Sequence, residues 1–339
     1  MIVQKTKIRK TFNYLIRALI ILVTYGFIYR QVFVERKLHE IVDVFNKMME
    51  QQQAWFMISL ILLLMLLNWS IESVKWRLLI AKIEKISFFR AFKAVMTGVS
   101  VSLFTPNRTG DYLGRVFILE KGNHVEGILI TLIGSFAQIV VTLSAGLFCF
   151  LSFLDQYLRV SYHVQEYLLI SLIFLIPCLI FIIMLFYFKI GILSDFIGRY
   201  MPRKWERFIE YSRVFARYCG KELLEVLLLS LLRYVIFSTQ FFLLLRMFGV
   251  ELPVIQGMIL IPVIYLAMTL VPSIALIDLG IRGSVSIFVI GLYFQKSGFN
   301  SGDTELAILT SSTVLWLVNL IIPAILGTFF VFSLKFFRK

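Results

Sequence analysis

Residues 102–115, SLFTPNRTGDYLGR, place a proline, a polar turn and an Asp-x-x-x-Arg pair, Asp111 and Arg115, inside an otherwise apolar region. The apolar arms on either side cover only residues 94–104 and 112–119. A helix rises about 1.5 Å per residue, so neither arm can cross a hydrocarbon core of roughly 30 Å. The stretch therefore predicts a re-entrant helical hairpin that turns near the middle of a membrane. Thin or tilted spans are the alternative.

A second stretch, residues 268–282 (MTLVPSIALIDLGIR), repeats the pattern with Asp278 and Arg282. Each Asp and each Arg lies 167 positions after its counterpart in the first stretch, and the flanking apolar runs share nearly that offset. Each copy reads span, span, hairpin, span, and an odd number of full spans inverts the second copy in the membrane. We predict an inverted repeat, with repeat one at about 14–153, repeat two at about 167–334 and a junction at 154–166. Inverted repeats with broken helices at the midplane are typical of secondary transporters.

The composition extends this prediction to the whole chain. Hydrophobic residues make up 59% and charged residues 16% of the 339, with a mean hydropathy of +0.87. Soluble domains carry about 25% charged residues. The apolar runs are long and do not alternate, which excludes a β-barrel. We therefore predict an all-α polytopic membrane protein, a single membrane domain over residues 1–339, with two re-entrant helical hairpins and six full transmembrane helices: about 14–33, 54–73, 126–153, 167–188, 222–246 and 304–334.

The net charge of +14 gathers between the apolar runs, mainly at residues 75–93 and 189–221. Positive loops mark the cytoplasmic side, which predicts two cytoplasmic termini. The expected location is a prokaryotic cytoplasmic (inner) membrane. Residues 189–221 are expected to form a cytoplasmic amphipathic loop on the anionic inner leaflet, with Trp205, Phe208, Ile209 and Phe215 on one face. The charge comes without a nucleic-acid-binding motif, so no nucleic-acid partner is expected.

The residue types that carry catalysis or bind metals form no recognisable pattern in the sequence. Cys149, Cys178 and Cys219 have no CxxC spacing, and the three histidines are dispersed. There is no nucleophile elbow, P-loop or zinc constellation. We expect no enzymatic activity, no metal and no cofactor.

Polar residues at membrane depth are the candidates for substrate binding, because ionisable groups there are expensive and mark a pathway or a pair. Helix N-termini at the turns would attract an anion such as a lipid phosphate, and arginine can bind it with two hydrogen bonds. The predicted substrate-binding residues are Arg108, Asp111, Arg115, Asp278, Arg282, Arg233, Gln138 and Asn319.

Each of these residues also has a structural alternative. The Asp and Arg four apart can pair with each other and hold the turn. Arg233 can extend to the interface or pair with a hairpin Asp, and Gln138 and Asn319 can simply join helices by hydrogen bonds. Glu72, Lys75 and Arg77 are expected to form a charge cluster at the membrane interface. The predicted hinge and turn residues are Pro106, Gly110, Gly114, Pro272, Gly280 and Gly283.

At the two turns the chain resembles the transmembrane region of lysylphosphatidylglycerol synthases, the flippase-like family. The residues that carry the resemblance are Pro106, Gly110, Asp111 and Arg115, then Pro272, Gly280 and Arg282. Two positions depart from the family pattern: Asp111 stands where Glu is common, and Gly283 follows Arg282 where Glu is common.

The resemblance implies a stand-alone lipid flippase without the soluble synthase domain. We expect alternating access at a midplane site that moves a charged or modified phospholipid, such as an aminoacyl- or other amino-phospholipid, between leaflets. The expected partners are membrane phospholipids and a separate lipid-modifying enzyme, and an oligomer is an open alternative. Two other functions are also open: an ion-coupled secondary transporter of a small solute, and a non-transporting membrane partner of a lipid-modifying enzyme.

Overall fold

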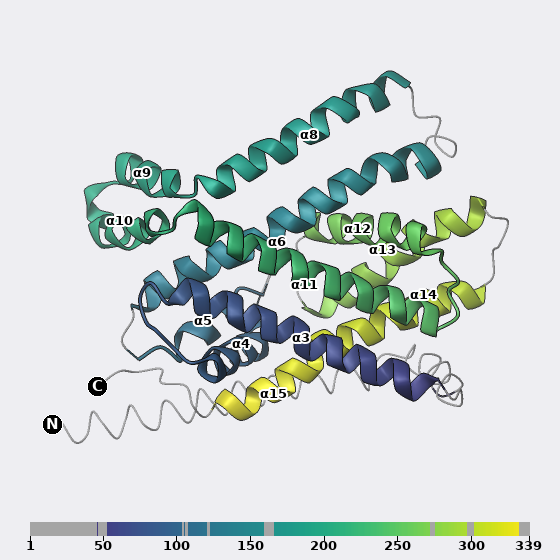
Figure 1. The fold of residues 1–339 in the computed structure, drawn as a ribbon, viewed down its shortest axis with the longest axis horizontal. Coiled ribbons are helices and arrows are strands. Elements are labelled where there is room, and N and C mark those ends of the chain that lie inside the picture. The colour runs from purple at the N-terminus through teal and green to yellow at the C-terminus, as the bar shows by residue number, and fades with distance from the viewer. Residues whose placement is uncertain are drawn as a thin grey trace.

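The structure is a computed structural model that describes residue 46 and residues 53–331, except for 104, 106–107, 121–122, 159–165, 272–274 and 297–301. The described residues form helices and loops and contain no strand (Figure 1). The α-helices are α3 (Ala54–Ile80), α4 (Phe88–Ser102), α5 (Gly110–Val116), α6 (His124–Phe153), α8 (Glu166–Phe188), α9 (Gly191–Tyr200), α10 (Glu206–Ser212), α11 (Gly220–Met247), α12 (Val254–Leu270), α13 (Ala275–Lys296), α14 (Gly302–Trp316) and α15 (Ile322–Val331). Two 3-10 turns, η3 (Arg203–Trp205) and η4 (Arg213–Arg217), and two π-helical turns, η2 (Leu154–Leu158) and η5 (Leu317–Ile321), connect or extend them.

Five helical segments of the described chain are long and apolar enough to cross a membrane: Ala54–Ile80, His124–Leu158, Glu166–Phe188, Gly220–Met247 and Asp303–Phe330. They coincide with five of the six spans predicted from the sequence. The prediction of an all-helical membrane protein is confirmed. The remaining predicted span, at about 14–33, lies outside the described residues.

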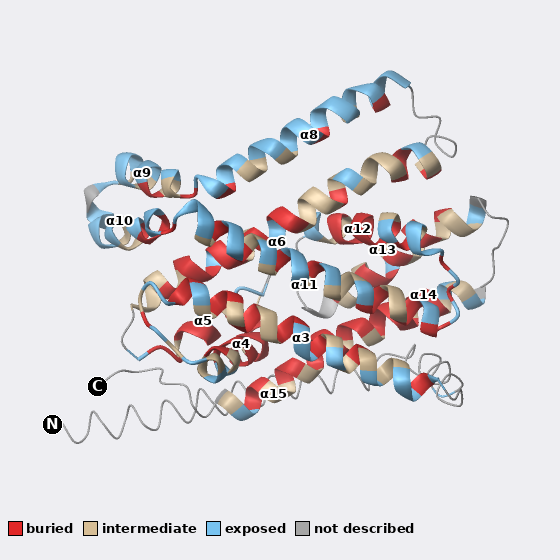
Figure 2. Cartoon of the chain, in the orientation of Figure 1, coloured by how far each residue is buried: buried red, intermediate tan, exposed pale blue. Residues whose placement is uncertain are grey.

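The burial pattern is that of a protein surrounded by hydrocarbon. Helix α8 exposes large apolar side chains along most of its length, for example Phe174 and Phe181 (Figure 2). Charged side chains such as Glu72 and Lys75 are buried instead. Apolar side chains lose nothing by facing lipid tails, whereas a charge there is costly, so the polar residues gather in the interior.

Two helical hairpins, α4 with α5 and α12 with α13, lie where the short apolar arms were predicted. Figure 1 shows α4 and α5 at the end of the molecule that also holds α9 and α10, while α12 and α13 lie toward the opposite end. The second hairpin departs from prediction, because the expected loop at residues 272–283 is helical from Ala275 onward. The two glycines of this stretch, Gly280 and Gly283, cost the helix only about 1 kcal/mol each, and the alanine and leucines before them favour helix.

Each hairpin packs its first arm against the last span of the other half of the chain. A Cβ atom on Gly327 of α15 would overlap Met96 O and Ser100 Oγ of α4. A Cβ on Gly146 of α6 would lie 2.9 Å from Pro262 O of α12. Both glycines thus permit a close helix crossing of the kind that small residues allow in membranes. The two halves of the chain are interlocked by reciprocal contacts.

The basic segment 189–221 is a set of short helices rather than a loop, and it is fastened to the same end as the start of α6 and the end of α3. Arg217 Nη2 lies 3.2 Å from Glu126 Oε1 of α6, and the Tyr218 hydroxyl donates to Leu79 O of α3 at 2.7 Å. Phe215 is buried and Trp205 is 51% exposed, so these two aromatic side chains lie in different surroundings, and the shared apolar face stays a prediction.

Candidate functional site

The polar interior is centred on Glu72, a buried carboxylate in α3 that contacts three cations from three helices. Its Oε2 lies 2.7 Å from Lys75 Nζ and accepts from Arg233 Nη1 of α11 at 2.8 Å. Its Oε1 accepts from Arg115 Nη1 of α5 at 2.7 Å. Glu72 and Lys75 are thus buried between helices, and their expected depth at the membrane interface stays a prediction. Both side chains lie on the face of α3 that is turned toward the other helices. There the ion pairs offset the free-energy cost of burying the Glu72 and Lys75 charges.

Arg115 joins the first hairpin to this centre. Its Nε and Nη2 donate to the two carboxylate oxygens of Asp111 at 2.8 and 2.5 Å, while Nη1 reaches Glu72. The predicted Asp-x-x-x-Arg pair therefore forms within α5. Arg115 also joins α5 to α3 through Glu72, which lies 43 positions earlier in the chain, so the sequence spacing does not predict this contact.

Arg233 connects the centre to the last span. Its Nε donates to Asn68 Oδ1 at 3.0 Å, and its guanidinium carbon lies 5.1 Å from the centre of the Trp69 ring. Asn68 Nδ2 in turn donates to Asn319 Oδ1 at 3.3 Å. Asn319 belongs to the π-helical turn η5, and such turns are frequent at functional sites. The expected alternative partner of Arg233, a hairpin Asp, is replaced by Glu72.

The two hairpins meet through one ion pair. Arg108 Nη2 at the first turn donates to Asp278 Oδ2 in α13 at 3.1 Å, and Arg282 Nη2 lies 3.5 Å from the same oxygen. Arg108 has a φ of 57°, the left-handed backbone region that non-glycine residues rarely adopt. Residues held in this region cluster at functional sites.

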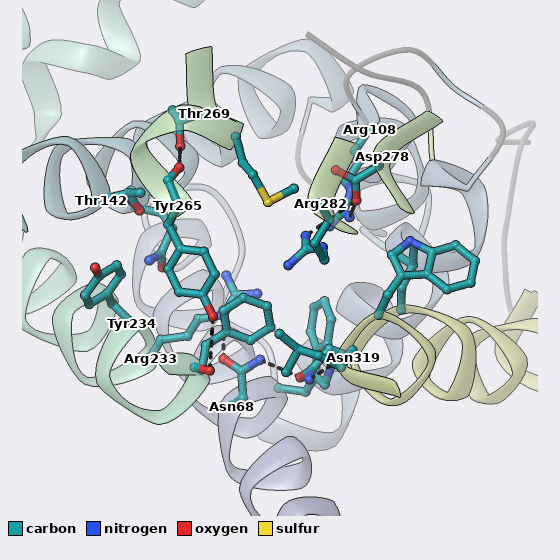
Figure 3. A pocket seen from close by; sticks show the side chains of 17 residues that line it. Asn68, Arg108, Thr142, Arg233, Tyr234, Tyr265, Thr269, Asp278, Arg282 and Asn319 are labelled. Carbon is teal, nitrogen blue, oxygen red and sulfur yellow. Dashed lines mark hydrogen bonds and ion pairs between the residues drawn. The ribbon is translucent and has the colours of Figure 1, made fainter. Parts of the chain in front are cut away.

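A cavity of about 290 Å³ opens between these elements (Figure 3). Figure 3 shows the Arg282 guanidinium directed into the open centre, with Arg108 and Asp278 beside it and Tyr265 and Asn68 across from it. The described residues that line the cavity are Asn68, Trp69, Arg108, Gln138, Thr142, Arg233, Tyr234, Phe237, Tyr265, Met268, Thr269, Asp278, Arg282, Leu315, Trp316, Asn319 and Leu320.

A second cavity of about 220 Å³ lies next to the first and shares part of its lining, including Arg108, Gln138 and Arg233. Glu72, Lys75, Asp111 and Arg115 complete its charged wall. The two cavities together reach from the Glu72 centre to the Arg108–Asp278 pair.

The structure brings all eight predicted substrate-binding residues to these two cavities. The larger cavity is lined by Arg108, Gln138, Arg233, Asp278, Arg282 and Asn319, and the smaller one by Asp111 and Arg115 as well. Their placement agrees with a shared site, and their role in binding stays a prediction. Sequence reasoning missed Glu72, Lys75, Asn68 and Trp69. The available signal was their spacing, which puts Asn68, Glu72 and Lys75 near one face of an apolar helix.

The predicted turn glycines lie inside helices. Gly110 and Gly114 belong to α5, and a Cβ on Gly114 would lie 2.6 Å from Gly98 Cα of α4, so Gly114 allows the two arms to pack closely. Gly283 of α13 packs against Leu309, whereas a Cβ on Gly280 would meet no atom of the described chain within 4 Å. Pro106 and Pro272 lie outside the described residues.

The sequence matches the family described as "Lysylphosphatidylglycerol synthase TM region" over residues 14–327. No curated protein and no solved structure matches the chain. The family match confirms the resemblance found at the two turns and includes both hairpins and all the residues that line the two cavities. The described residues contain no group of three or more His, Cys, Asp or Glu that could hold a metal ion.

Proposed function

The chain belongs to the lysylphosphatidylglycerol synthase transmembrane family, and from that premise we propose that it moves a phospholipid with a charged or modified headgroup between bilayer leaflets. The observation that carries the proposal is the cavity of about 290 Å³, lined by three arginines and located where the two hairpins meet. A cavity of this size can enclose a headgroup but not two acyl chains. The headgroup would cross through the polar interior while the chains remain in lipid.

The proposal includes a topology of six spans and two re-entrant hairpins arranged as an inverted repeat. It is supported by the equal order of the described elements from the second span of each half onward. The reciprocal glycine contacts at Gly146 and Gly327 and the position of the hairpins toward opposite ends support it as well. We place the basic end, with α9 and α10, and both termini on the cytoplasmic side of a prokaryotic inner membrane. There it would contact anionic lipid.

The energetic reason for such a cavity is the penalty of moving a charge through hydrocarbon. Insertion scales put it at roughly 2.5–3.5 kcal/mol per charged residue at the bilayer centre, and simulations put it higher. The guanidinium groups that line the cavity would replace the hydrogen bonds to water that a lipid phosphate loses when it leaves the membrane surface. In the alternating-access scheme one repeat rocks against the other, and the Arg108–Asp278 pair between the hairpins would open and close in each cycle.

A reconstitution experiment tests the proposal. The purified chain is inserted into liposomes that carry fluorescent phospholipids, and a membrane-impermeant quencher reports how fast labelled lipid changes leaflet. We expect faster exchange than in protein-free vesicles, and slower exchange after Arg233→Gln than after Arg246→Gln, an exposed arginine of the same helix outside both cavities. Protein-free rates for every lipid tested would overturn the proposal and leave a small-solute transporter or a non-transporting partner of a lipid-modifying enzyme.

A further inference from the structure

Building on the proposed function, we propose that the cavity at Arg282 is a phosphate subsite selective for net-anionic headgroups, and that it disfavours headgroups carrying an aminoacyl cation. The inference depends on lipid or phosphate chemistry reaching the cavity, and it narrows the substrate class to an unmodified anionic phosphate ester.

The first observation is the unsatisfied guanidinium of Arg282. Its side chain is 10% exposed, and Nη2 approaches Asp278 at 3.5 Å. Its Nε and Nη1 are buried and have no hydrogen-bond partner within the described part of the chain. Leaving buried charged donors unpaired is costly, and arginine forms strong paired bonds to phosphate oxygens. An anion in the cavity would satisfy both nitrogens.

The indole nitrogens of the lining point to the same ligand chemistry. Nε1 of Trp69 and Nε1 of Trp316 are buried and also lack a partner among the described residues. Indole N–H groups only donate, as guanidinium groups do. The other buried atoms of the lining without a partner in the described chain are the Gln138 amide oxygen, which accepts, and the Tyr234 hydroxyl. Donors therefore outnumber acceptors, which suits a ligand rich in acceptor oxygens, such as a phosphate.

The carboxylates of the two cavities are already paired with cations of the chain. Glu72 is held by Lys75, Arg115 and Arg233. Asp111 is held by Arg115, and Asp278 by Arg108 and Arg282. A cationic headgroup would have to displace one of these partners. The remaining cations of the cavity would repel the cationic headgroup and so disfavour it relative to an anionic one.

The aromatic faces that could bind an ammonium group are also partly occupied. The Arg233 guanidinium lies over the Trp69 ring, and that of Arg282 lies 6.0 Å from the centre of the Phe237 ring. Tyr265 packs against Phe237 and Tyr234, with ring centres 5.3 and 6.0 Å apart. Cation–π binding of a headgroup amine would compete with the protein's own arginines.

The test compares four fluorescent lipids with identical chains in proteoliposomes: phosphatidylglycerol, phosphatidic acid, phosphatidylethanolamine and lysylphosphatidylglycerol. We expect the two anionic lipids to exchange about tenfold faster than lysylphosphatidylglycerol, because the added ammonium groups of that headgroup would lie beside the arginines of the cavity. Faster exchange of lysylphosphatidylglycerol, or equal rates for all four, would overturn the anion-selective subsite and leave lipid translocation standing.

Two variants and a soluble-anion arm complete the test. Arg282→Gln should slow exchange of the anionic lipids about tenfold, and Arg282→Lys should restore part of it, whereas Arg246→Gln should leave the rate unchanged. A normal rate in a folded Arg282→Gln protein, as judged by size-exclusion chromatography, would refute the subsite. Release of trapped radioactive inorganic phosphate without lipid exchange would support the subsite but overturn the proposed function.

Discussion

Arg108 and Asp278, 170 positions apart in the chain, form an ion pair of 3.1 Å between the two helical hairpins. It joins the two hairpins beside the cavity. The pair is half open to the surroundings, since the Arg108 side chain is 46% exposed. A contact of this kind stabilises the fold little and can be broken at low cost, which suits a contact that changes during a cycle.

The first prediction concerns this pair. Arg108→Gln and Asp278→Asn should each lower lipid exchange about tenfold. Arg108→Gln should shift the free energy of unfolding by less than about 1 kcal/mol, whereas Asp278→Asn should cost more, because the buried Arg282 loses its counter-charge as well. The double variant should exchange lipid no more slowly than Asp278→Asn alone, because that variant has already removed the Arg108–Asp278 interaction. Exchange rates and thermal unfolding of the four proteins measure the coupling. Fully additive losses would show that the two residues act separately.

The second prediction concerns the buried carboxylate. Glu72→Gln leaves Lys75, Arg115 and Arg233 without their shared counter-charge, so it should destabilise the protein by about 3–5 kcal/mol. Thermal unfolding in detergent measures the loss. Glu225→Gln, on the exposed side of α11, is the matched control and should change stability by less than about 0.5 kcal/mol. Equal stability of the two variants would contradict the assigned role of Glu72.

The third prediction compares the stability effect of alanine at a close-packed glycine, Gly327, with its effect at an open one, Gly280. Gly327→Ala places a methyl group against Met96 O and Ser100 Oγ, and overpacking of this kind should cost about 1–3 kcal/mol. Gly280→Ala adds a methyl group in open space within α13 and should be neutral or stabilising by up to about 1 kcal/mol. Unfolding temperatures in one detergent compare the two. A large loss at Gly280 would indicate a turn there instead of a helix.

The fourth prediction tests the orientation of the basic end. Cys219 is exposed next to the first turn of α11, where Lys82 and Glu222 pair. A membrane-impermeant maleimide should label it in inside-out vesicles and not in intact cells, with Cys219→Ser as the control. Labelling from outside intact cells would reverse the proposed topology.

The spans and the pairing within each motif were accessible from the sequence. Hydrocarbon leaves backbone groups no partner except other backbone groups, so long apolar runs must be helical wherever they occur. Asp111 with Arg115 and Asp278 with Arg282 are four residues apart, and one helical turn brings such side chains together. The family resemblance was readable for the same reason, since its motifs are local.

Only the tertiary structure decided which charges share a site. Glu72 lies near the basic end of its span, which in sequence resembles an interfacial charge, and only the approach of α5 and α11 makes it the centre of the polar interior. Likewise, a separation of 170 positions carries no sign that Arg108 meets Asp278. Apolar runs and helical pairs depend on neighbours along the chain and are therefore written in the sequence. Ion pairs between helices and the cavity they line depend on how helices cross, which packing alone determines.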